Sequence, residues 1–137
     1  MTNIDPLPAP VPPSAGRPAQ PSGPPWLVIL GLASLALLWP LTALLGFGDG
    51  AARALTLLGL IALAWIGVVG FAPVRMPVLT LTLTGTAYGV ITLLIGTVFG
   101  TADGPIWALL VALALDAFWG MIAGLLALGI QRLRRRA

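Results

Sequence analysis

The sequence predicts an all-α integral membrane protein: an antiparallel bundle of four transmembrane helices behind a disordered, proline-rich N-terminal tail. The first observation is composition, because 58% of the residues are hydrophobic, 8% are charged and the mean hydropathy is +1.03. Soluble domains carry roughly a quarter charged residues, so this chain has too few polar groups to cover a surface that faces water. The second is that the apolar residues form four stretches of the length that crosses a bilayer, about 20 residues each.

Residues 1–25 contain nine of the thirteen prolines. Proline fixes the backbone angle φ and lacks an N–H donor, so neither a helix nor a sheet can form across such a run. We therefore expect a disordered cytoplasmic tail with polyproline II character. Such a tail could bind a groove on a partner, but a solvated spacer is the simpler interpretation.

The membrane domain is predicted to cover residues 26–130, with spans at about 26–47, 54–72, 78–99 and 105–130. The spans must be helices, because lipid offers the backbone no hydrogen-bond partner. Short segments rich in glycine, proline and aspartate separate them. Loops this short make sequential helices antiparallel neighbours.

The arginines predict the orientation of the chain in the membrane. Cytoplasmic loops are enriched in Lys and Arg. If the N-terminus is cytoplasmic, Arg53 alone lies outside, and the inside holds Arg17, Arg75, Arg132, Arg134, Arg135 and Arg136. We therefore expect a multi-pass protein of the cell (inner or plasma) membrane with both termini in the cytoplasm. The basic tail of residues 131–137 is interpreted as a topology and headgroup contact rather than a nucleic-acid site, since no other basic patch extends it.

Several side chains used for chemistry are missing from the sequence. It contains no Cys, no His and no Lys. Thiolate sites, imidazole bases and Schiff-base lysines are thereby excluded. We expect no enzymatic activity, no cofactor and no metal site. The exclusive use of Arg as cation, with abundant Ala, Leu, Gly and Pro, favours a GC-rich bacterial genome.

Asp116, near the middle of the fourth span, is the one charged side chain inside a predicted span. An ionised carboxylate at that depth costs about 2.5–3.5 kcal/mol, so such residues face other helices. It belongs to a helical stripe of small residues: Ala112, Asp116, Gly120, Ala123 and Ala127, with Gly124 beside it. The third span has a matching stripe: Thr82, Gly85, Gly89, Thr92 and Gly96. Small residues allow close helix contact, so we expect these two spans to pack together with Asp116 at or beside the contact.

The hairpin between the last two spans suggests partners for this carboxyl group. The loop is centred near Ala102, so Tyr88 and Asp116 share a depth, and Thr84 and Thr92 lie one turn on either side of Tyr88. Their hydroxyls are candidate hydrogen-bond donors to Asp116. No cation lies at this depth, so we expect an uncharged carboxyl group at rest.

Asp116 therefore has a structural and a functional interpretation. It could hydrogen-bond helices to one another or to a partner subunit, or it could be a proton or cation relay. We expect an accessory, scaffold or assembly subunit without catalysis, in contact with the lipid bilayer and with another membrane protein or a second copy of itself. The alternatives are a small oligomeric transporter or channel that uses Asp116, and a holin-like pore former.

Overall fold

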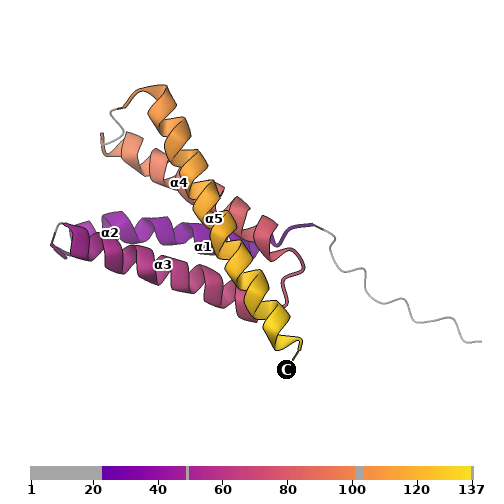
Figure 1. Ribbon diagram of the computed structural model, residues 1–137. Coiled ribbons are helices and arrows are strands. Elements are labelled where there is room, and N and C mark those ends of the chain that lie inside the picture. The colour runs from indigo at the N-terminus through magenta and orange to yellow at the C-terminus, as the bar shows by residue number, and fades with distance from the viewer. Residues whose placement is uncertain (1–22, 49, 101–103, 137) are drawn as a thin grey trace, which may run out of the picture.

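The computed structural model describes residues 23–48, 50–100 and 104–136, and all regular structure in these residues is helical (Figure 1). The elements are α1 (Trp26–Ala33), η1 (Ser34–Leu37), α2 (Leu38–Leu44), α3 (Ala51–Phe71), α4 (Pro77–Val98) and α5 (Ile106–Arg134). The first three follow one another without a break over Trp26–Leu44. The expectation of four helices long and apolar enough to cross a membrane is confirmed. Most of the predicted N-terminal tail, residues 1–22, lies outside the described residues.

Proline and glycine set the helix boundaries. Pro77 is the first residue of α4, where its missing N–H has no helical partner to lose and its fixed φ suits the helix. Pro105 directly precedes α5. Gly100 follows α4 with φ of 65°, the left-handed conformation that commonly ends a helix. The starts of α4 and α5 and the end of α4 therefore lie where backbone sterics favour them.

Pro40 explains the break in the first span. A proline inside a helix cannot donate to the carbonyl four residues earlier, which here is Ala36. The chain tightens into the 3₁₀ turn η1 over Ser34–Leu37, just before Pro40, and then returns to α-helix in α2. The two helical pieces still form a single span of 19 residues.

The close pair α4–α5 crosses the first span and α3, and each of these packs mainly against one member of that pair. In Figure 1, α3 lies alongside α1 and α2, while α5 crosses the end of α3 on its way to the C-terminus. The closest packing joins α4 to α5, and α5 also packs against α3 while α4 packs against α1. The buried cluster draws on all four spans: Leu32, Ala33, Ala36, Ile61, Trp65, Val69, Leu81, Tyr88, Ala123 and Ala127.

The last helix continues to Arg134, beyond the predicted end of the span at residue 130. Its final turns are held by the end of α3. The Gln131 side-chain amide donates to the carbonyls of Val69 (2.8 Å), Ala72 (3.2 Å) and Val74 (3.3 Å). Arg134 donates to the carbonyl of Phe71 at 3.1 Å and lies 5.1 Å from the centre of its ring. The bonds to Val69 and Phe71 satisfy carbonyls that a helix end leaves without partners, whereas the carbonyl of Ala72 also accepts from the Val74 amide.

Candidate functional site

The contact between α4 and α5 is made by glycine backbones. A Cβ atom on Gly85 would overlap the carbonyl oxygen of Asp116 and lie 3.2 Å from the Cα of Gly120. A Cβ atom on Gly120 would overlap the carbonyl oxygen of Leu81. One turn further along, a Cβ atom on Gly124 would lie 2.6 Å from the Cα of Val78. The two helices thus meet main chain to main chain, which only residues without a side chain permit.

Gly89 performs a different task, because it makes room for the Asp116 side chain. A Cβ atom on Gly89 would lie 2.7 Å from Asp116 Oδ2 and 2.9 Å from a methyl carbon of Leu113. The carboxyl group therefore occupies the space that the missing side chain leaves. Gly96, the last glycine of the predicted stripe, is half-buried near the end of α4. The site begins where the glycine contact ends, at the Gly89–Asp116 pair.

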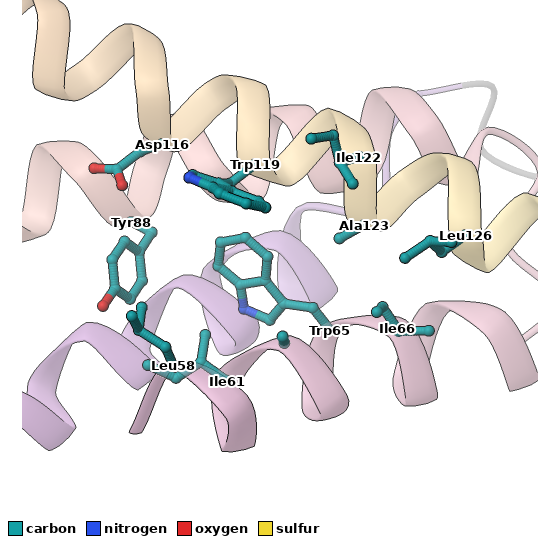
Figure 2. Close-up of a pocket in the computed structure, with 11 residues that line it drawn as sticks. Leu58, Ile61, Trp65, Ile66, Tyr88, Asp116, Trp119, Ile122, Ala123 and Leu126 are labelled. Carbon is teal, nitrogen blue, oxygen red and sulfur yellow. The ribbon is translucent and has the colours of Figure 1, made fainter. Parts of the chain in front are cut away.

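From this position Asp116 reaches the end of a groove between α3 and α5 (Figure 2). The groove has a volume of about 330 Å³. Its lining residues are Leu58, Ile61, Ala62, Trp65, Ile66, Tyr88, Asp116, Trp119, Ile122, Ala123 and Leu126. Figure 2 shows Tyr88 and Trp119 beside Asp116, with Trp65 between Trp119 and α3. The groove is thus an apolar, aromatic cavity with a single carboxyl group.

Tyr88 does not make the hydrogen bond to Asp116 that the shared depth suggested. Its hydroxyl oxygen accepts a bond from Trp39 Nε1 at 2.6 Å, on the side away from Asp116. Its ring meets Trp65 edge to face, with centroids 5.6 Å apart and an interplanar angle of 84°. Two residues near the same depth need not face one another, because a helix also sets the direction of each side chain around its axis.

The two threonines also bond elsewhere. Thr84 donates its hydroxyl to the carbonyl of Thr80 at 2.9 Å, and Thr92 donates to the carbonyl of Tyr88 at 3.0 Å. Both bonds run to the preceding turn of α4, a common arrangement for threonine in a helix. Among the described residues, the carboxyl group of Asp116 accepts no hydrogen bond and forms no ion pair.

Two tryptophans hold the walls of the groove in place. Trp65 Nε1 donates to the carbonyl of Leu32 at 3.2 Å, which ties α3 to α1. Trp39 Nε1 ties α2 to α4 through Tyr88. An indole N–H deep in an apolar span needs a hydrogen-bond acceptor. The position of these tryptophans in the sequence therefore indicates that they are hydrogen-bonded, but it does not identify the acceptor. Gln131 is a lone side-chain amide directly after the predicted fourth span, and its position likewise indicates a hydrogen-bonded residue. No role was predicted for it.

Of the arginines expected to mark the cytoplasmic side, Arg75 and the four of residues 132–136 gather at one end of the molecule, while Arg17 lies outside the described residues. The bonds of Gln131 bring the end of α5 against the loop before α4, which carries Arg75. Arg132, Arg135 and Arg136 are exposed, as is Arg75, while Arg134 bonds Phe71. At the other end, Arg53 donates to the carbonyl of Trp39 at 2.6 Å.

In the part of the chain that the structure describes, no group of three or more His, Cys, Asp or Glu residues is placed to hold a metal ion. The chemistry available at the groove is therefore that of one carboxyl group, aromatic faces and aliphatic surface. Comparisons with protein families, with curated proteins and with solved structures find no match for this chain.

Proposed function

We propose that the chain is a multi-pass membrane protein that serves as an accessory or assembly subunit and catalyses no reaction itself. The observation that carries this proposal is the surface of α5. Of its most apolar 18-residue stretch, 17% is buried, the smallest share among the four spans. One side of α5 is occupied by α4 and the groove, whereas its outer side presents the large exposed side chains Leu110, Phe118 and Leu125. This outer side of α5 is the surface that we assign to a partner helix.

Photocrosslinking tests the assignment. A photoreactive phenylalanine analogue at position 118 should give a discrete protein adduct in intact cells, and the same analogue in place of Leu63, an exposed residue of α3, should not. The adduct protein should also co-purify with the wild-type chain in mild detergent and be lost from the Leu125→Ser variant. Adducts with lipid alone at position 118 would contradict an accessory role. An adduct of twice the chain mass would favour the oligomeric alternative below.

In this proposal the four helices are antiparallel spans of the cell membrane with both ends of the chain in the cytoplasm. The single-ended cluster of Arg75 and the α5 arginines supports it, since positive charge is retained inside. The sequence has no cysteine, so single cysteines report cleanly on each side. Ala51→Cys should react with an impermeant maleimide added to intact cells, and Met76→Cys should react only after lysis. The opposite pattern would reverse the orientation.

A small oligomeric transporter or channel is the second candidate, and the groove is the observation that favours it. A carboxyl group with open acceptors at the end of an apolar cavity is an arrangement that transport sites use. Four helices enclose too little space for a pathway, so this function requires at least a dimer. Asp116→Asn in reconstituted vesicles is the test. Loss of pH-dependent flux is expected if the carboxyl group is the coupling site, and unchanged flux would remove it from the mechanism.

A further inference from the structure

We propose that the groove between α3 and α5 is a binding site for an apolar organic monocation, with the charged end of the ligand at Asp116. This inference goes beyond the accessory role. If the chain is instead a transporter, apolar organic monocations would be its class of substrate. It depends on one part of the proposed function, the insertion of α5 into the membrane. In water the carboxylate would be hydrated and would gain little from a ligand.

The size of the groove favours a small molecule over a helix. Its volume of about 330 Å³ lies in the range of ligand pockets, about 300–1,000 Å³. Three turns of α-helix with a diameter of 10–12 Å would need on the order of 1,000 Å³. A partner helix could therefore cover the mouth of the groove but could not enter it. The outer side of α5, which we assigned to a partner, lies elsewhere on the helix.

The charge of the ligand follows from Asp116. Its carboxyl group accepts no hydrogen bond from the described residues, and none of the other groove-lining residues carries a positive charge. Once ionised, this half-buried carboxylate is stable at membrane depth only when a partner offsets its desolvation. An anionic ligand would be repelled, and a neutral hydrocarbon would leave the carboxylate without a partner. A cation with an apolar body satisfies both the acid and the remaining walls.

The aromatic side chains supply a second contact for the same charge. Figure 2 shows the Tyr88 ring directly below Asp116 and the Trp119 indole beside it along α5, with Trp65 deeper in the groove. Aromatic faces attract cations, and indole does so most strongly. Trp65 and Tyr88 are fixed by their bonds to Leu32 and Trp39, so these faces are already in position before a ligand arrives.

Binding exchanges a proton for the cation. The carboxyl group is expected to be uncharged at rest, so its O–H bond breaks, the proton passes to solvent and an ion pair forms with the ligand. Tyr88 from α4 is the other titratable group among the lining residues, and its hydroxyl is bonded to Trp39. The residues that α3 contributes are aliphatic apart from Trp65. One proton should therefore be released for each cation bound.

The test uses radiolabelled benzyltrimethylammonium and the full chain in nanodiscs of zwitterionic lipid. Equilibrium dialysis should show saturable binding of one cation per chain, with one proton released. Asp116→Asn should weaken binding at least tenfold and abolish proton release. Trp119→Leu should weaken binding several-fold, while Trp107→Phe, at an exposed position outside the groove, should change nothing. The neutral carbon analogue neopentylbenzene should fail to displace the cation.

Besides a complete lack of binding to the inserted chain, three results would overturn the inference. They are equal binding to empty nanodiscs, equal binding to the wild-type chain and to Asp116→Asn, and displacement by neopentylbenzene. If Asp116→Asn does not reconstitute, Trp119→Leu decides the matter, because its exposed side chain can be changed without altering the core. Extraction of the wild-type chain by alkaline carbonate would instead refute membrane insertion. A chain that inserts but does not bind the cation refutes this inference alone.

Discussion

Gly120 is the position where the close contact between α4 and α5 can be tested most directly. In Gly120→Ala the new methyl group would overlap the carbonyl oxygen of Leu81, a backbone atom that cannot rotate away. The neighbouring Gly124 shows how tight this contact is, because a Cβ atom there would lie 2.6 Å from the Cα of Val78, whereas ordinary contacts begin at 3.4 Å. A new methyl group in this contact therefore forces the two helices apart. Overpacking of this kind costs about 1–3 kcal/mol.

Gly129→Ala is the matched control for Gly120→Ala. It lies on the same helix and makes the same chemical change, but its new methyl group would have nothing within 4 Å. The helix propensity of alanine should make Gly129→Ala neutral or stabilising by up to ~1 kcal/mol. Thermal unfolding in detergent, followed by tryptophan fluorescence, should place Gly120→Ala about 3–10 °C below the control. Equal midpoints would show that α4 and α5 do not meet through their main chains at this point.

Two further predictions concern the hydrogen bonds that join the helices. Gln131→Leu removes the donor to the carbonyls of Val69 and Val74, whereas the carbonyl of Ala72 keeps its bond from the Val74 amide. A loss of about 1–3 kcal/mol implies that amide exchange in residues 74–76 should accelerate roughly 5- to 150-fold, and unchanged exchange measured by mass spectrometry would contradict it. A double-mutant cycle of Trp39→Phe and Tyr88→Phe should give a coupling free energy of about 0.5–1.5 kcal/mol in unfolding experiments, and additive effects would mean that the two side chains are not bonded.

The helical content of the fold could be predicted because its cause is local. A run of about 20 apolar residues has few alternatives in lipid, and Pro77 and Pro105 mark the starts of the last two helices in the sequence itself. The end of α5 could not be found in this way. Its last turn is fixed by Gln131, whose acceptors lie about 60 residues earlier in the chain, and sequence periodicity contains no information about such a contact.

The candidate site was predicted only in part, because some of its features are local in the sequence and others depend on contacts between distant residues. Glycine spacing pointed to a contact between the last two spans, and Gly85 and Gly120 do face one another there. Depth arithmetic placed Tyr88 near Asp116, and both line one groove. The direction of the Tyr88 hydroxyl was beyond that arithmetic, because it depends on Trp39, a residue on a different hairpin. The groove itself arises from the crossing of α3 and α5, which no single stretch of sequence encodes.

Asp116 combines two roles that its backbone and side chain perform separately. Its carbonyl oxygen lies against Gly85 within the helix contact, while its carboxyl group leaves that contact over Gly89 and enters the groove. Asp116→Asn therefore removes the titratable acid and preserves the helix contact, whereas Gly89→Ala keeps the acid but displaces the carboxyl group. If the acid only fills space beside Gly89, the first change should be silent and the second should destabilise the fold. If the acid serves a ligand or a partner, both changes should abolish that binding, and only the second should also affect stability.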